Sequence, residues 1–254
     1  MSNATDYPWL VFAASFFVLW LSARIGATFV RRRKQEADTR KDFGVILVAT
    51  LALLGLVIGF GFSIAISQYD LRKSYEETEA NAIGTEYVRA DLLPAADAAK
   101  LCGLLSRYLD QRVLFCGTRD ALQLQQLNTD TAQLQTDLWF AVRAPAAAQP
   151  TPVVAIAVSG MNDVLNSEGY AQAAWRSRIP ISAWCLMAAV AICCNALVGY
   201  GVRNRKAEAV RLLTLPLVVS ISFMLIADID SPRAGIIRVN AQHLISLAES
   251  LHSH

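Results

Sequence analysis

The chain has 254 residues, of which 54% are hydrophobic and only 17% are charged, with a net charge of +2. A soluble domain carries about 25% charged residues, so this composition excludes an ordinary soluble domain. The small net charge gives no indication of a nucleic-acid partner. The apolar residues form four runs, each long enough to cross a bilayer, at about residues 8–30, 43–67, 179–200 and 212–229.

The first apolar run is predicted to be a retained membrane helix. No Lys or Arg precedes it, and it is followed by the basic residues 31–34 instead of a small-residue cleavage site, unlike a signal peptide. The second run passes into polar sequence with no proline and a single glycine, Gly84, before residue 90. We therefore predict one continuous helix whose first half lies in lipid and whose second half lies in water.

Two short loops, at 31–42 and 201–211, are rich in Lys and Arg. Short basic loops stay in the cytoplasm. This bias predicts that both termini and the segment 68–178 lie on the opposite side of the membrane.

The segment after the second run is predicted to be helical throughout. Pro94 marks the start of one helix and Gly117 its end, and a second helix begins near Thr118. Residues 146–152, rich in Ala and Pro, read as a linker before a third helix at 153–178. The prediction is an all-α membrane protein with membrane helices at 1–67 and 179–229, an extramembrane bundle at 68–178, and a tail at 230–254 with a short amphipathic helix.

Cys102 and Cys116 lie in this segment, and two outcomes stay open for them. On one continuous helix they would be about 21 Å apart, whereas a disulfide needs Cα atoms within about 7 Å. A chain reversal near 110–112 would allow a bridge.

Several motifs resemble known families. The stretch at 56–62 followed by 69–72 resembles the pore helix of bestrophins, and 229–235 resembles their segment after the fourth span. The sequence is more closely similar to the bacterial bestrophin-like family, through residues 79–85 (EANAIGT), 89–94 (RADLLP) and 228–232 (DIDSP).

The resemblance implies a pentameric homo-oligomer in the bacterial inner membrane, surrounded by lipid. It implies conduction of monovalent ions, anions in bestrophins and cations in some bacterial members, with no cofactor. In bestrophins the middle segment and termini are cytoplasmic, which conflicts with the charge bias of the short loops. Both orientations stay open.

Ala52, Leu56 and Phe60 recur at i, i+4 and i+8, so they share one face of the second helix. Under the resemblance this row is the pore constriction, which gates by excluding water. The simpler alternative is that these side chains face lipid or a neighbouring helix.

Polar candidates follow in the second helix and after the last apolar run. Arg72, Glu76, Glu79 and Arg89 are expected to form a solvated face, a charged vestibule or interhelix ion pairs. Asp228 and Asp230 end the last run, where acids invite a cation or an Arg partner such as Arg72 or Arg89. Two acids are too few for calcium, which favours a salt bridge or a helix-end turn.

An enzyme is not indicated. The three histidines lie in the tail, and no catalytic or metal-binding motif is present. The alternative to a channel is a membrane-anchored sensor or scaffold whose helical bundle binds a partner or small ligand without conducting ions.

Overall fold

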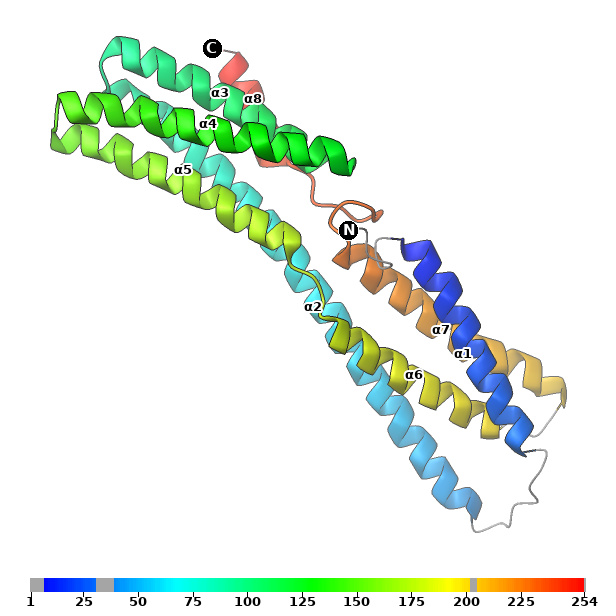
Figure 1. Cartoon of the computed structure of the whole chain (residues 1–254). Coiled ribbons are helices and arrows are strands. Elements are labelled where there is room, and N and C mark those ends of the chain that lie inside the picture. The colour runs from blue at the N-terminus through cyan, green and yellow to red at the C-terminus, as the bar shows by residue number, and fades with distance from the viewer. Residues whose placement is uncertain (1–6, 31–38, 202–204, 254) are drawn as a thin grey trace. The chain divides into compact units, whose positions relative to one another are not determined.

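The structure is a computed structural model that describes residues 7–30, 39–201 and 205–253. Within these ranges every regular element is a helix, which confirms the all-α prediction (Figure 1). Parts of both basic loops, 31–38 and 202–204, lie outside the described residues. The elements are α1 (Pro8–Val30), α2 (Thr39–Arg89), η2 (Ala90–Leu92), α3 (Ala95–Gly117), α4 (Ala121–Ala148), α5 (Pro152–Arg176), α6 (Ile181–Gly201), α7 (Arg205–Asp230) and α8 (Gln242–His252).

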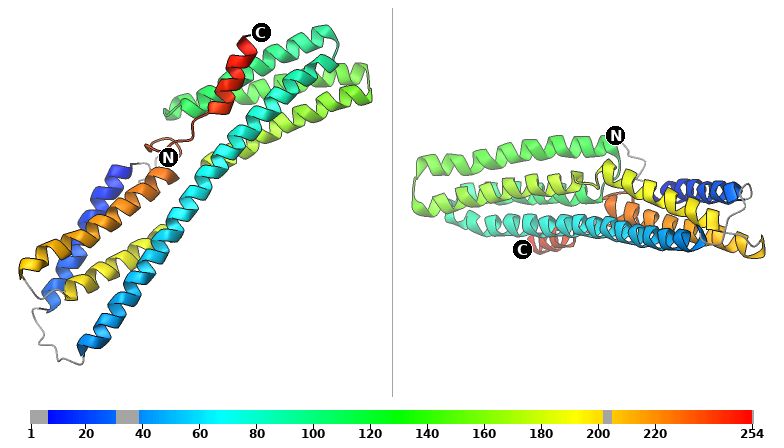
Figure 2. Two further views of the ribbon diagram at one scale, coloured as in Figure 1. Left: turned by 180° about the vertical axis from the view of Figure 1, so that it is seen from behind. Right: turned by 90° about the horizontal axis from the view of Figure 1, so that it is seen from below.

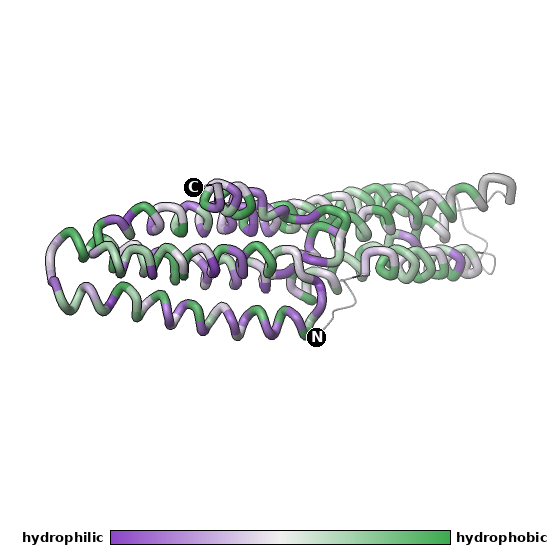
Figure 3. The backbone as a smooth tube through the Cα atoms, turned by 90° about the horizontal axis from the view of Figure 1, so that it is seen from above, coloured by the Kyte–Doolittle hydropathy of each residue, from purple (hydrophilic) through white to green (hydrophobic). Residues whose placement is uncertain are grey.

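Four helices, α1, α2, α6 and α7, contain the stretches that are long and apolar enough to cross a membrane. This agrees with the four runs predicted from hydropathy. The continuous second helix is confirmed, since α2 runs for 51 residues without interruption. Figure 3 shows long hydrophobic stretches in these helices and alternating hydrophobic and hydrophilic residues along α3, α4 and α5.

The chain divides into two compact units. The membrane unit comprises Met1–Gln68 and Arg178–Ile237, and the bundle unit comprises Tyr69–Ser177 and Arg238–His254. The helix α2 supplies residues to both. Residues 230–237, assigned by sequence to the tail, belong to the membrane unit.

Within the membrane unit, α1 packs closely against α6 and α7. Two glycines permit the close approach of α1 and α6. A Cβ on Gly26 would collide with the backbone carbonyl of Ala196, and a Cβ on Gly199 would collide with that of Ala23. The two contacts are reciprocal, because each helix offers a glycine to the carbonyl of the other, as expected for small residues at membrane helix crossings.

The bundle unit is built on one apolar core. The helices α3 and α4 pack together, as do α4 and α5, and α8 lies beside α3 (Figure 2). The polar half of α2 contributes Ile83, which is completely buried in this core. The fully buried members of the other helices include Leu101, Leu105 and Tyr108 of α3, Leu138 and Val142 of α4, Met161 and Val164 of α5, and Leu244 of α8.

Two helix boundaries differ from the prediction. The helix α4 begins at Ala121 because Asp120 caps it, its side chain accepting a hydrogen bond from Leu122 N at 3.0 Å. The expected linker at 146–152 is helical as far as Ala148, with Pro145 inside α4. Alanine has the highest helix propensity, and here it outweighs the neighbouring prolines.

The two cysteines of the extramembrane segment both lie on α3 and are both free. The chain reversal that a bridge would need is absent, because α3 continues through residues 110–112 to Gly117. The outcome is the one expected for a single continuous helix.

Candidate functional site

The apolar half of α2 leaves one face uncovered by the rest of the chain. Only 6% of the residues in its most apolar stretch are buried. Leu56 is 55% exposed and Phe60 is 60% exposed, and Ala52 on the same face is also exposed. The predicted row at i, i+4 and i+8 therefore lies together on an unoccupied face of α2.

The opposite face of α2 holds the helix in the membrane unit. Leu54 and Ala65 are buried there. Gly61 lies against Met187 and Ile226, so that an added Cβ would come within 2.6 Å of the Met187 sulfur. The attachment of α2 to its own unit is thus separated from the row of Ala52, Leu56 and Phe60.

Two further glycines lie on the uncovered side of α2. An added Cβ on Gly55 or on Gly59 would meet no atom of the chain within 4 Å. Neither glycine is therefore required for packing within one described chain. Small residues on a membrane helix allow a second helix to approach closely.

The polar half of α2 buries a stripe of charged side chains. Arg72, Glu76, Glu79 and Glu86 are each at most 1% exposed. They recur at alternating intervals of three and four residues together with Ile83, which is the spacing of one helix face. These four charged groups therefore form no solvated face, and each must be stabilised by a partner or carry an energetic cost.

Glu79 forms a buried ion pair with Arg112 of α3. The Arg112 guanidinium donates to both carboxylate oxygens, through Nε and through Nη2, the latter at 3.3 Å. Its Nη1 lies 3.5 Å from Glu168 of α5, and its guanidinium carbon lies 4.5 Å from the centre of the Phe115 ring. Burial alone would lower the pKa of Arg112, but the hydrogen bond to Glu79 and the combined attraction of Glu79, Tyr108 and Glu168 raise it. Burial also raises the pKa of Glu79, and the charge of Arg112 opposes this rise. The pair joins α2 to α3.

Arg72 and Glu76 are paired with helix ends. Arg72 donates to the carbonyls of Ala174, at 3.2 Å, and of Ser177, at 2.7 Å, where α5 terminates. Glu76 accepts from Leu244 N at 3.0 Å and lies 2.8 Å from Nδ1 of His243, where α8 begins. A cation at a helix C-terminus and an anion at a helix N-terminus both match the helix dipole.

Glu86 is the exception in the stripe. Its carboxylate is fully buried, and neither oxygen has a hydrogen-bond partner among the described residues. It lies against Gly160 of α5, where an added Cβ would collide with the carboxylate. Burial, opposed by Arg89 and reinforced by Asp163, raises the pKa of Glu86 to about 7. Arg89 itself lies 3.9 Å from Asp163 at a partly exposed position.

Asp228 and Asp230 bind backbone amides at the end of α7. The two carboxylate oxygens of Asp228 accept from Ile236 N at 2.8 Å and from Ile237 N at 2.9 Å. Asp230 accepts from Ile179 N at 2.9 Å. These contacts form a helix-end turn, and within the described ranges no group of His, Cys, Asp and Glu is arranged to hold a metal ion.

Sequence reasoning missed Arg112, Glu168 and His243 as members of this polar network. A signal for Arg112 was present, because it continues the buried stripe of α3 one turn after Tyr108 and Leu109. A charged residue inside an apolar stripe requires a buried partner of opposite charge. The sequence alone does not identify that partner, since Glu79 lies 33 residues away.

Comparisons with known proteins agree with the resemblance. Two solved variants of a bacterial bestrophin homolog from Klebsiella pneumoniae are similar to this chain in fold. One has a TM-score of 0.64 at 11% identity, covering 95% of this chain and 94% of that chain. The other has a TM-score of 0.65 at 12% identity, covering 94% and 98%. A comparison with curated proteins finds no match.

The family is decided by sequence and not by these distant structures, since identity this low shows the fold alone. The four long apolar helices make the chain a membrane protein. A family model described as the Bestrophin-like domain matches residues 10–244, nearly the whole chain. The chain therefore belongs to the bestrophin-like domain family.

Proposed function

We propose that the protein is an oligomeric ion channel of the bacterial inner membrane, with a pore for monovalent ions lined by α2. The observation that carries the proposal is the uncovered row of Ala52, Leu56 and Phe60. Copies of α2 arranged around a common axis turn such a row into stacked apolar rings. Narrow apolar rings gate conduction by excluding water.

The uncovered side of α2 also suits contact between copies. Gly55 and Gly59 leave open space on this side. Without a side chain they let a neighbouring helix approach closely, as small residues do in membrane helix interfaces. Family membership supports a pentamer and supports conduction as the function of the assembly.

The test is conduction by the purified protein in planar bilayers. Phe60→Ala widens one proposed ring and is expected to change the single-channel conductance or the open probability several-fold. Phe17→Ala is the matched control, because Phe17 on α1 is also 60% exposed and belongs to a different helix. Equal effects of the two substitutions would contradict a pore along α2.

The competing function is a sensor or scaffold that conducts no ions. Particle images of the detergent-solubilised protein separate the two. A ring of copies with α2 at its axis supports the channel. A monomer that carries no current at any voltage or pH tested, and that binds a partner through residues 95–175, supports the scaffold.

A further inference from the structure

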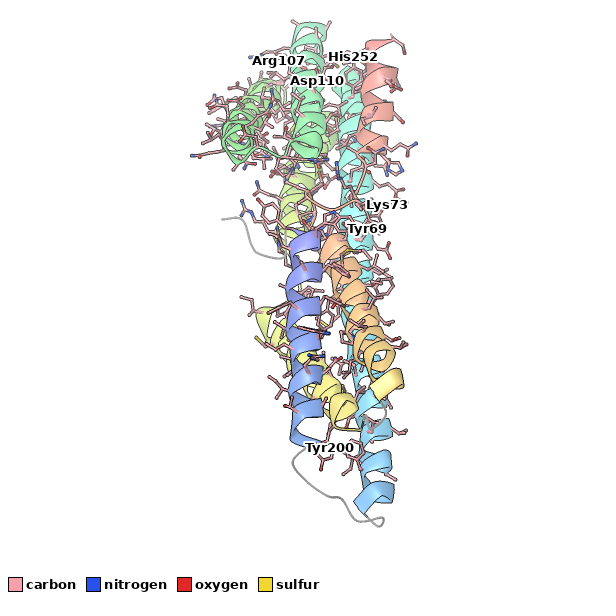
Figure 4. All side chains as sticks on the ribbon, turned by 90° about the vertical axis from the view of Figure 1, so that its right-hand side faces the viewer. Tyr69, Lys73, Arg107, Asp110, Tyr200 and His252 are labelled. Carbon is pink, nitrogen blue, oxygen red and sulfur yellow. The ribbon has the colours of Figure 1, made fainter. Side chains whose placement is uncertain are left out.

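The bundle unit contains a polar pocket of about 410 Å³ at the start of its α2 segment. Two of its lining residues, Tyr69 and Lys73, lie one turn apart on α2 (Figure 4). The others come from the segment before α8 and from the first turns of α8: Arg238, Val239, Asn240, Gln242, His243 and Ser246. Its volume is within the range of small-ligand sites.

The lining of this pocket is cationic. The Lys73 ammonium is exposed and forms no ion pair or hydrogen bond with any residue that the structure describes. Arg238 supplies a second permanent positive charge to the same lining. Asp70 and Glu77 flank Lys73 on α2 but do not line the pocket. The lining itself contains no Asp or Glu side chain.

His243 is held in place by an acidic group beneath the pocket. Its Nδ1 lies 2.8 Å from the Glu76 carboxylate, which is only 1% exposed. This contact fixes the orientation of the imidazole ring. Nε2 forms no hydrogen bond or ion pair within the described part of the chain and is available to a ligand. The negative charge of Glu76 is committed to His243 and to Leu244 N.

The uncharged lining residues complete a set of donors. Asn240 and Gln242 contribute amides and Ser246 a hydroxyl, all on exposed positions. A guanidinium, an ammonium and an imidazole combined with neutral donors match the several oxygens of a phosphate group. No carboxylate in the lining would repel it.

We infer that this pocket binds a phosphate group, either of an anionic phospholipid headgroup or of a soluble phosphate. Lys73 follows the end of the apolar run at residue 67 by six residues in α2. Basic residues immediately outside a membrane helix attract anionic headgroups. The inference does not depend on conduction, and binding can be measured on a non-conducting protein.

The experiment uses the full chain in neutral detergent and measures the shift of its thermal midpoint with three probes. The probes are phosphatidylglycerol, a lipid with the same acyl chains and a sugar headgroup without phosphate, and inorganic phosphate. Stabilisation by phosphatidylglycerol but not by the sugar lipid or by inorganic phosphate assigns the site to a headgroup. Stabilisation by inorganic phosphate assigns it to a soluble anion. Either result supports the phosphate chemistry, and no shift with either phosphate probe overturns it.

Substitutions locate the binding. Lys73→Gln and Arg238→Gln are each expected to weaken the apparent affinity for the active probe about tenfold, as loss of a charge-assisted contact does. Lys100→Gln on α3 is the matched control, because this exposed lysine lies outside the pocket lining. Comparing the ligand-induced shift, not the midpoint itself, separates binding from any change in stability. Equal affinities of the two pocket variants and the control would show that the phosphate binds elsewhere.

Discussion

The Glu79 carboxylate of α2 and the Arg112 guanidinium of α3 form a bidentate ion pair whose side chains are 1% and 0% exposed, respectively. Both groups lost their hydration on folding, and each depends on the other to offset that cost. Truncating one partner leaves the other charged and unpaired in the bundle core.

Glu79→Gln or Arg112→Met alone is expected to lower the free energy of unfolding of the bundle by about 3–5 kcal/mol. The double variant is expected to lose much less than the sum, because it leaves no unpaired charge. Chemical unfolding of the full chain in detergent, followed by circular dichroism, gives the double-mutant cycle. Asp130→Ala is the control, because Asp130 accepts only an exposed hydrogen bond from Gln126. This variant is expected to change the free energy of unfolding little. Additive losses would show that the two side chains are not coupled.

Glu86 is expected to make stability depend on pH. Its pKa is about 7 in the folded chain against an ordinary value of 4.5. Between these values the folded chain binds more protons than the unfolded chain, so the free energy of unfolding falls as pH rises from 4.5 to 7. Above pH 7 the loss is complete and the carboxylate is charged between Gly160, Arg89 and Asp163.

Glu86→Gln removes this titration. The thermal midpoint of the variant is expected to be higher than that of the wild type at pH 8 and equal to it at pH 4.5. Glu77→Gln, at an exposed position of the same helix, is the control and should follow the wild-type profile. Parallel profiles of the Glu86 variant and the wild type would show that this carboxylate does not titrate in the range.

The crossing of α1 and α6 is expected to be intolerant of a single methyl group. In Gly199→Ala the new Cβ meets the Ala23 carbonyl, and a backbone atom cannot move aside without separating the helices. Overpacking of this kind costs about 1–3 kcal/mol, measurable as a lower thermal midpoint in detergent. Gly103→Ala is the control, since its added Cβ meets nothing within 4 Å. Equal midpoints in the two variants would contradict the close crossing.

Asp228 is expected to protect two amides of the segment after α7. Asp228→Ala removes both acceptors from Ile236 N and Ile237 N, and hydrogen exchange at these amides should accelerate more than tenfold, as expected for loss of hydrogen bonds worth about 1 kcal/mol each or more. Asp228→Asn keeps one acceptor oxygen, and its effect should be intermediate. Unchanged exchange in the Ala variant would show that the turn is held by other contacts.

The spans and the continuity of α2 could be predicted because they depend on local properties. Hydropathy and length decide the four membrane helices, and the lack of a breaker after residue 67 decides the long helix. Gly117 ended α3 as expected. The linker predicted at 146–152 is present but shorter, at residues 149–151, because the alanines at 146–148 continue α4.

The partners of the charged stripe could not be predicted, because they depend on tertiary contacts. Glu76 accepts a hydrogen bond from Leu244 N at the start of α8, 168 residues later in the sequence. Arg72 donates to the carbonyl of Ser177 at the end of α5, 105 residues later. A charged residue in a polar stretch normally remains in water. Burial was indicated only by the shared three-and-four spacing of the charges with Ile83. The row at Ala52, Leu56 and Phe60 was predictable as a face, but its role depends on other copies of the chain.

In the first half of α2 apolar side chains are exposed within one chain, and in the second half charged side chains are buried. The two halves are therefore expected to tolerate different substitutions. In the half up to Gln68, many apolar side chains are uncovered, and exchanging one for another of similar size leaves the folding of a single chain unaffected. In the half after it, replacing a buried and paired group such as the Arg72 guanidinium or the Glu79 carboxylate is severe even when size is kept. In a saturation scan read out by cellular abundance, apolar exchanges would therefore be tolerated at Leu56 and Phe60, whereas uncharged substitutions would be rejected at Arg72 and Glu79, the opposite of the usual rule that hydrophobic positions resist mutation.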